Sequence, residues 1–184
     1  MEPNPNPNEQ FETLVAEHYE PLFRFAFSLT RAESDAQDLT QQTFYIWATK
    51  GHQLREPAKV KSWLFTTLHR TFLKIRGRQV RFPHTELDSV AAELPAVAAE
   101  TSSESDSAQV LSALAKIDDI YQAAVALFYL QQHSYKEIAE ILQIPIGTVK
   151  SRIARGILQL RHLLQTDGSI VLPQPGNSSQ SHQS

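Results

Sequence analysis

The sequence predicts an all-α protein in which two small helical domains are joined by a flexible acidic linker. Apolar residues recur at helical spacing on both sides of a central segment, and no stretch shows the alternation of a β-strand. The central segment, residues 82–107, contains six acidic residues and neither lysine nor arginine. It is rich in Ala, Glu, Ser and Pro, a composition typical of flexible linkers. The 184 residues suffice for two small domains.

The first domain is expected over residues 9–81, after a disordered N-terminal stretch of residues 1–8. Apolar residues from Phe11 to Leu29 predict its first helix. Pro21 is expected to interrupt or restart that helix, because proline lacks a backbone N–H and its ring crowds the preceding turn.

Two further helices complete this domain. Ser34 and Gln37 match a capping box, which predicts a helix over residues 34–50 that ends at Gly51. A third helix is predicted over residues 58–76. Its apolar residues fall on one stripe, formed by Val60, Leu64, Leu68, Phe72 and Ile75.

A helix-turn-helix is predicted in the second domain, which is expected over residues 108–165 before a disordered tail at 166–184. Residues 134–142 begin with a second capping box and form a short helix. A compact turn at 143–145 then leads into the last helix. Two helices joined in this way can hold a recognition helix away from a small core. The residues expected to face inward on the last helix are Val149, Ile153, Ile157, Leu160 and Leu164.

The opposite face of the last helix follows from its geometry of about 100° per residue. Thr148, Ser151 and Arg155 are expected to point away from the core, with Lys150 and Arg152 beside them. Arginine can pair with a guanine edge in the major groove, serine and threonine are adaptable partners, and flanking cations suit phosphates. The alternative is an amphipathic helix with a solvated basic face.

Charge is strongly segregated along the chain, although the net charge is only −3. Residues 55–81 hold eight basic residues and one acidic residue, and residues 146–162 hold four basic residues and no acidic one. Two basic patches on either side of an acidic linker suggest two contacts with a polyanion. Two ordinary solvated helix faces are the alternative explanation.

Composition excludes several classes of protein. The chain has no cysteine, so disulfides and thiolate zinc sites are excluded, and it has no apolar run long enough for membrane insertion. Its polar N-terminus does not resemble a secretory signal. Its seven histidines are scattered, and it has no Gly-rich phosphate loop or nucleophile motif. We therefore expect a cytoplasmic protein that is not an enzyme and that has no catalytic residue, metal site or cofactor.

Three segments in order resemble the sigma-70 family of RNA polymerase sigma factors, in its extracytoplasmic-function (ECF) group. They are DAQDLTQQTF at residues 35–44, VKSWLFTTLHRTFLKIRGR at 60–78 and SYKEIAEILQIPIGTVKSRI at 134–153. The resemblance covers about residues 9–165. It implies a bacterial sigma factor that binds the polymerase core, directs it to specific promoters and assists promoter opening.

The resemblance also implies a role for each part of the chain. The first segment would dock on the clamp helices of the largest polymerase subunit, and the flap region of the polymerase core is also expected as a contact. The docking residues would be Asp35, Asp38, Gln41, Gln42, Phe44 and Trp47. The single-stranded −10 element would be held by Lys59, Lys61, Arg70, Lys74, Arg76 and Arg78. The duplex −35 element would be bound by Thr148, Lys150, Ser151, Arg152 and Arg155.

Some residues depart from the family pattern or allow a second interpretation. Gln42 stands where the family commonly has Glu, and Ile117-Asp118 replaces a common Leu-Pro. Phe44 could simply belong to the core. Trp63 is expected in the core in preference to stacking on a base.

The free protein is expected to be a monomer that is controlled by an anti-sigma factor, as ECF proteins commonly are. Two other functions remain as rivals. A response-regulator-like transcription factor would need alternating strands and helices, which residues 9–81 do not show. An interaction protein that mimics a sigma factor without binding DNA is disfavoured by the intact basic faces.

Overall fold

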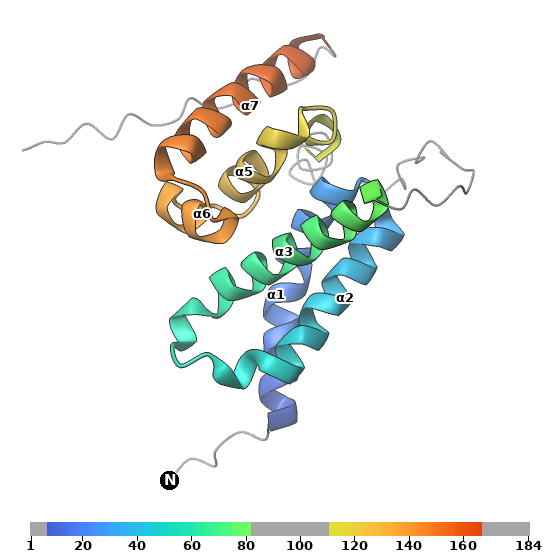
Figure 1. The fold of residues 1–184 in the computed structure, drawn as a ribbon, viewed down its shortest axis with the longest axis vertical. Helices are drawn as coiled ribbons and strands as arrows, with labels where there is room; N and C mark the ends of the chain where they lie inside the picture. The colour runs from blue at the N-terminus through green and yellow to red at the C-terminus, as the bar shows by residue number, and fades with distance from the viewer. Residues whose placement is uncertain (1–6, 82–110, 167–184) are drawn as a thin grey trace, which may run out of the picture.

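The computed structural model describes residues 7–81 and 111–166, and all the regular structure in these two ranges is helical (Figure 1). The all-α prediction is therefore confirmed. The first range contains α1 (Pro7–Thr30), α2 (Glu33–Lys50), 3-10 turns at Gly51–Gln53 and Pro57–Lys59, and α3 (Val60–Arg81). The second range begins with a helical turn at residues 111–114 and continues with α5 (Asp119–Tyr129), α6 (Tyr135–Leu142) and α7 (Ile146–Thr166).

The three segments predicted to be disordered or flexible lie wholly or mostly outside the described residues. These are the N-terminal stretch up to residue 6, the acidic linker at 82–107 and the tail from residue 167. Helix α1 already includes residues 7 and 8, so it begins two residues before the predicted start of the first domain. In the described ranges, no helix is both long and apolar enough to cross a membrane.

Helices α1, α2 and α3 pack around one apolar core. Helix α2 contributes Leu39 and Phe44, whose ring packs against Phe11 with the centroids 6.5 Å apart. The burial of Phe44 matches the core interpretation of this residue. Helix α1 also contributes Leu29, which is 7% exposed. Six further side chains of α1 and α3 are at most 1% exposed, and they are Leu22, Phe25, Ala26, Leu64, Phe65 and Leu68.

Pro21 does not interrupt α1, contrary to the sequence-based expectation. The helix is continuous from Pro7 to Thr30, with Pro21 inside it. Leu22 and Phe25 follow the proline directly and are 0% exposed. Their burial outweighs the missing hydrogen bond, because most of the stability of a helix in a protein comes from packing of its apolar face.

The predicted limits of α2 and α3 also shift. Ala32, in an extended conformation, is the N-cap of α2 and provides no side-chain cap, so the capping box predicted at Ser34 is wrong. Helix α3 runs through Gly77 to Arg81, beyond the predicted end at residue 76. A single glycine lowers helix stability by only about 1 kcal/mol, which a helix of this length tolerates.

The second domain forms the predicted helix-turn-helix. The Ser134 side chain accepts a hydrogen bond from the Glu137 backbone N–H, and the Glu137 carboxylate accepts one from the Ser134 backbone N–H at 2.8 Å, which completes the capping box of α6. Gln143 ends α6 with φ 55°, in the left-handed region that is more usual for glycine. The predicted inward stripe of α7 is buried at each position whose side chain is described: Val149, Ile153, Ile157 and Leu160.

Gly156 marks the point at which α7 crosses α5. A Cβ at this position would lie 2.4 Å from Val125 Cγ2 and 3.0 Å from Tyr121 Cβ. The absence of a side chain therefore allows the two helix backbones to approach closely.

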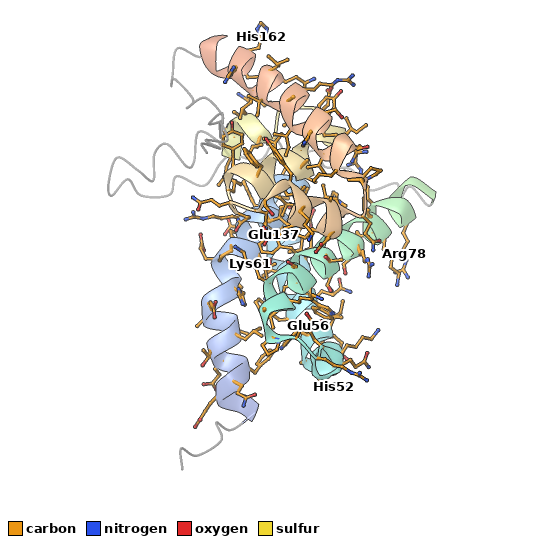
Figure 2. The ribbon with its side chains drawn as sticks, turned by 90° about the vertical axis from the view of Figure 1, so that its left-hand side faces the viewer. His52, Glu56, Lys61, Arg78, Glu137 and His162 are labelled. Atoms are coloured by element: carbon orange, nitrogen blue, oxygen red, sulfur yellow. The ribbon has the colours of Figure 1, made fainter. Side chains whose placement is uncertain are left out.

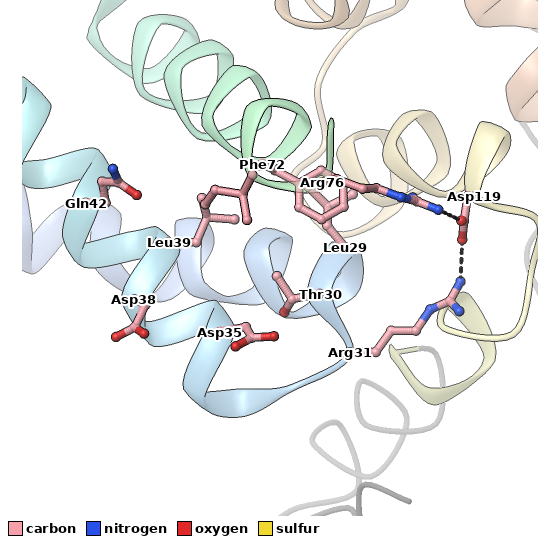
Figure 3. A pocket seen from close by; sticks show the side chains of 11 residues that line it. Leu29, Thr30, Arg31, Asp35, Asp38, Leu39, Gln42, Phe72, Arg76 and Asp119 are labelled. Carbon is pink, nitrogen blue, oxygen red and sulfur yellow. Dashed lines mark hydrogen bonds and ion pairs between the residues drawn. The ribbon is translucent and has the colours of Figure 1, made fainter. Parts of the chain in front are cut away.

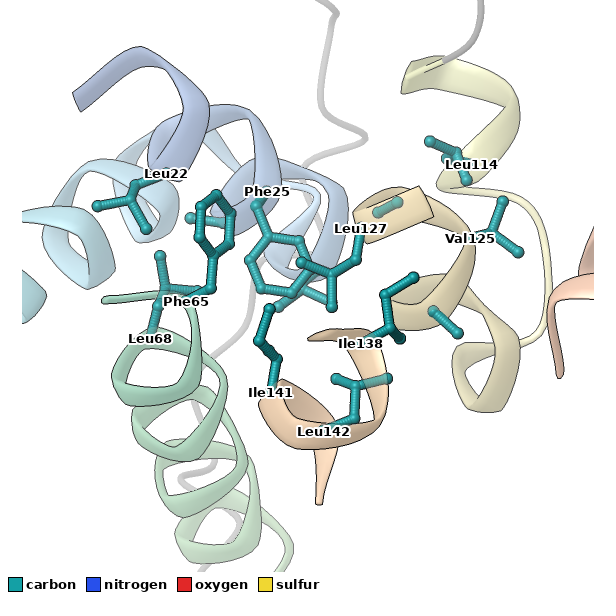
Figure 4. Packing of buried hydrophobic residues seen from close by; sticks show 14 of the residues in the cluster. Leu22, Phe25, Phe65, Leu68, Leu114, Val125, Leu127, Ile138, Ile141 and Leu142 are labelled. Carbon is teal, nitrogen blue, oxygen red and sulfur yellow. The ribbon is translucent and has the colours of Figure 1, made fainter. Parts of the chain in front are cut away.

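The two halves of the molecule also pack against each other. Helix α5 contacts α1, and α6 contacts α3. Figure 4 shows Phe25, Phe65, Leu127 and Ile141 in one apolar cluster that spans the boundary between the halves. All four side chains are at most 1% exposed.

Candidate nucleic-acid interface

The face of α7 that points away from the core carries the residues predicted to read bases. Lys150, Ser151 and Arg155 are exposed, and Thr148 and Arg152 are half-buried. Ser151 Oγ donates a hydrogen bond to the Thr148 carbonyl at 3.0 Å, so the helix itself orients this hydroxyl. Helix α7 contains no acidic residue. Its outer face therefore has the shape and charge of a helix that enters a major groove.

The cations predicted to hold the −10 element lie on two different faces of α3. At about 100° per residue, Arg70, Lys74 and Arg78 share one face, and all three are exposed. Lys61 and Arg76 lie on the opposite side, toward the two ends of the helix. Lys61 and Arg76 each bond to a residue of the second domain, although both remain exposed.

Lys59 lies before α3 and has a partner of its own. Its Nζ is 2.9 Å from a carboxylate oxygen of Glu56, and this hydrogen bond raises the pKa of Lys59 above its usual value. The pair holds the turn at Pro57–Lys59, which leads directly into α3.

The loop before α3 is anchored by two tryptophans. Trp47 and Trp63 meet edge to face, with ring centroids 5.1 Å apart, and both pack against the core. Trp63 is thus a core residue, as expected. A Cβ on Gly51 would lie 2.5 Å from the Trp47 ring, so only glycine allows the 3-10 turn to lie against this indole.

The polar residues predicted to dock on polymerase form an exposed row on α2. Asp35, Asp38, Gln41 and Gln42 are all exposed. Trp47 is half-buried. The docking surface that α2 can offer therefore consists of carboxylates and amides together with Tyr45, which is 71% exposed and was not in the predicted set. The aromatic residues of the predicted set, Phe44 included, mainly support this surface from behind.

A cavity of about 350 Å³ separates this row from the second domain (Figure 3). Across it, the carboxylate of Asp119 at the start of α5 forms an ion pair with Arg31 at 2.7 Å and a second ion pair with Arg76. The Arg76 hydrogen bond is the main reason why the pKa of Asp119 is lowered, and Arg31 adds to the effect. Asp119 was not among the residues singled out from the sequence.

The segment between α5 and α6 makes a second polar contact across the boundary. Gln131 Nε2 donates to the Pro21 carbonyl at 3.0 Å, and Lys61 Nζ donates to the Gln131 carbonyl at 3.4 Å. The His133 ring packs edge-on against Phe65, with the centroids 4.9 Å apart. Figure 2 shows Lys61 close to the second domain and Arg78 toward the far end of α3. Sequence reasoning did not find this contact either.

Two histidines at the boundary are kept neutral. Burial lowers the pKa of His133 to about 4, and the Lys61 charge adds to the shift. Burial lowers the pKa of His69 on α3 to about 4 as well, with a further contribution from Arg152 of the recognition helix. Helix α7 thus lies within electrostatic range of α3. Among the described residues, no group of His, Asp or Glu side chains is arranged to hold a metal ion.

Two family models match this chain. The model described as Sigma-70 region 2 matches residues 14–82, and the model described as Sigma-70, region 4 matches residues 107–160. The first match contains α2 and α3, and the second contains the helix-turn-helix.

Several characterised proteins are similar over most of the chain. The ECF RNA polymerase sigma factor SigE of Mycolicibacterium smegmatis is 33% identical over 163 residues, which cover 86% of this chain and 63% of that protein. The ECF RNA polymerase sigma factor SigM of Mycobacterium tuberculosis is 30% identical, over 84% of this chain and 76% of SigM. The RNA polymerase sigma factor YlaC of Bacillus subtilis is 27% identical, over 83% of this chain and 91% of YlaC.

Solved structures show the same fold. The sigma factor RpoE in complex with the anti-sigma factor NepR, from Bartonella quintana, superimposes with a TM-score of 0.70 at 29% identity. That superposition covers 86% of this chain and 99% of RpoE, so it includes both domains. CnrH in complex with the cytosolic domain of CnrY gives a TM-score of 0.62 at 24% identity, over 87% of this chain and 90% of CnrH.

Proposed function

Because this chain belongs to the ECF group of the sigma-70 family of RNA polymerase sigma factors, we propose that it brings the polymerase core to specific promoters and assists their opening. One observation carries the proposal. The chain combines an exposed basic recognition helix with a second basic helix that follows an acidic docking row. A transcription factor that binds only duplex DNA needs the first feature alone.

Helix α7 would bind the −35 element as duplex. Arg155 is exposed near the middle of the helix and is the residue best suited to pair with a guanine edge. Lys150 and Arg152 would contact phosphates on either side. Arg155→Ala should lower transcription from a promoter that contains the cognate −35 element. Arg161→Ala removes the same charge nearer the end of α7 and serves as the matched control.

The exposed face of α3 would hold the melted −10 strand. Arg70, Lys74 and Arg78 can follow a phosphate backbone, and the loop anchored by Trp47 and Gly51 precedes the same helix. Replacing Arg70 and Lys74 with Ala should impair promoter opening more than polymerase binding.

The exposed row on α2 would dock on a basic and apolar groove of the polymerase. Asp38→Ala should weaken binding to the polymerase core. Glu20→Ala removes an exposed carboxylate from α1, outside the row, and is the control. Polymerase binding would occur in the cytoplasm, where the polymerase acts.

Control by an anti-sigma factor is supported by the superposition on RpoE. RpoE was solved with its anti-sigma factor bound, and both of its domains superimpose together on this chain. We propose that an inhibitor protein recognises the same arrangement of the two domains here.

Run-off transcription with bacterial core polymerase tests the proposed function. Promoters would be selected from a random library, with and without this protein. Transcription that requires the protein, and that is lost in both Arg155→Ala and Asp38→Ala, would support two separate contacts. Binding to duplex DNA without any gain in polymerase specificity would instead favour an ordinary transcription factor.

A further inference from the structure

A large apolar side chain lies on the basic face of α3. Leu73 is 52% exposed, and it follows Arg70 by one turn of the helix and directly precedes Lys74. At about 100° per residue, Leu73 and Arg70 are separated by about 60° around the helix axis, so they are surface neighbours. A single exposed leucine is common on protein surfaces, so a role for Leu73 follows only from its position among exposed cations.

Ile75 shows where an exposed apolar residue lies on another face of α3. It is 39% exposed and about 160° around the axis from Leu73, and it lines the cavity between α2 and the second domain. Leu73 does not line that cavity, and it is outside the apolar core of the described residues. Packing within the described part of the chain therefore does not account for an apolar residue at position 73.

The two tryptophans near this face cannot take the place of Leu73 against DNA. Trp47 and Trp63 meet edge to face and both pack against the core. Rings engaged in this way cannot insert between bases without disrupting the loop before α3. Among the described side chains of α3, Leu73 is therefore the apolar group best placed to touch a base.

The surface next to Leu73 is open. Gly77 lies one turn further along α3 and about 40° from Leu73 around the axis. A Cβ at this glycine would meet no heavy atom within 4 Å. The next turn of the helix therefore presents no side chain that would keep a planar base away from Leu73.

Promoter opening needs an apolar contact as well as positive charge. Separating neighbouring base pairs loses the free energy of their stacking. Cations that bind phosphates position a strand but do not replace that stacking. Apolar side chains inserted at a base step replace part of it. Arg70 and Lys74 would supply the first kind of contact, and Leu73 beside them the second.

We propose that Leu73 acts as a wedge, inserting against the last stacked base pair at the edge of the melted −10 element while Arg70 and Lys74 hold the phosphates of the separated strand. This inference rests on the proposed function and adds to it a residue that acts on base stacking. Because pyrimidine–purine steps unstack most easily, a TA step at that edge would open in preference to a GC-rich one.

Forked DNA gives a direct test of unstacking. The probe is a duplex with a TA step next to a single-stranded arm, and 2-aminopurine replaces the last paired adenine. The fluorescence of 2-aminopurine rises when the base leaves the stack. The full chain, alone and with bacterial core polymerase, is added at low salt until binding is saturated. We expect the wild type to raise the fluorescence at saturation.

Leu73→Ala removes the apolar contact and keeps every charge. At saturation, the ratio of unstacked to stacked probe should fall about fivefold to twentyfold, since a leucine offers less contact than the aromatic rings that stack on bases. Leu73→Phe should keep or raise the unstacked fraction. Ile120→Ala is the matched control, because it removes the same number of carbon atoms from a side chain that is 55% exposed and lies on α5, outside both proposed DNA surfaces.

Leu73→Lys distinguishes a wedge from a residue that only adds affinity. A lysine extends the basic face, so this variant should need less protein for half-saturation. It should nevertheless unstack the probe less at saturation, because an ammonium group does not replace stacking. A lysine variant that binds more tightly and unstacks at least as well as the wild type would overturn the proposal.

Run-off transcription gives a second readout. A promoter recovered by the library selection is used as a duplex and again with mismatches that open its −10 element. Leu73→Ala should reduce run-off from the duplex about fivefold to twentyfold relative to Ile120→Ala, and the mismatches should remove most of this defect. A defect of the same size on the mismatched promoter would assign Leu73 to folding or polymerase binding and would overturn the wedge.

The outcomes separate this inference from the proposed function. A wild-type protein that leaves the 2-aminopurine stacked would overturn the wedge, and so would a Leu73→Ala protein that matches Ile120→Ala in both readouts. A chain that still supports transcription then loses only the inference. If the selection recovers no promoter, the proposed function fails, while the forked DNA still tests Leu73.

Discussion

Replacing Gly156 with alanine should destabilise the second domain, although alanine is the better helix former. The new methyl group would overlap Val125 Cγ2, which belongs to a stiff β-branched side chain that is 0% exposed. Helices α5 and α7 must then move apart. An extra methyl group in a packed core costs about 1–3 kcal/mol, and the helix propensity of alanine offsets about 1 kcal/mol. The net loss in the free energy of unfolding is up to about 2 kcal/mol.

Gly147 supplies the matched control on the same helix. No atom lies within 4 Å of a Cβ built at this position, so Gly147→Ala should be neutral or stabilising by up to about 1 kcal/mol. Urea unfolding followed by far-ultraviolet circular dichroism measures both variants. Trp47 and Trp63, the only tryptophans, report separately on the first domain. A Gly156→Ala protein as stable as wild type, or two variants that shift alike, would refute the argument from close helix crossing.

Three other predictions concern α6, the domain boundary and polymerase docking. Ser134→Ala removes the capping box of α6 and should lower stability by about 1 kcal/mol in urea unfolding, whereas an unchanged midpoint would show that the cap is dispensable. The folded-state pKa of His133, about 4, lies below its ordinary value of 6.5, so the unfolded chain takes up the proton first as the pH falls. The stability contribution of neutral His133 is therefore complete above about pH 6.5 and is lost on approaching pH 4, by at most about 3 kcal/mol. His133→Gln should lose less stability than wild type between pH 7 and pH 5, and equal losses would contradict this assignment. Gln42→Glu adds a carboxylate to the exposed row on α2 and should tighten polymerase binding about twofold to fivefold in a titration with labelled core, whereas weaker binding would place Gln42 outside the docking surface.

Features that depend on nearby residues could be predicted from the sequence. The capping box at Ser134 and the buried stripe from Val149 to Leu160 follow from spacing within one helix, and both are confirmed. Predictions failed where packing outweighed a local preference. Pro21 lies within an unbroken helix because the residues after it are buried, and Ser34 yields the N-cap position to Ala32.

The contact between the domains could not be predicted in this way. Arg76 and Asp119 are 43 residues apart, and no periodic pattern identifies them as partners. The position of His133 in the sequence does not reveal its burial either, yet its side chain is 1% exposed and its Nε2 has no hydrogen-bond partner. Helical periodicity shows which side of a helix is buried, but it does not show which distant element covers that side.

The buried contact at Phe25, Leu127 and Ile141 has a consequence for the lifetime of the protein in the cell. A molecule whose two domains separate while no other protein is bound exposes this apolar surface. Chaperones and proteases act on such exposed states, and small changes in their population alter protein abundance several-fold. We therefore expect molecules with separated domains and no bound partner to be degraded first, so that turnover in the cell depends on whether a partner is bound.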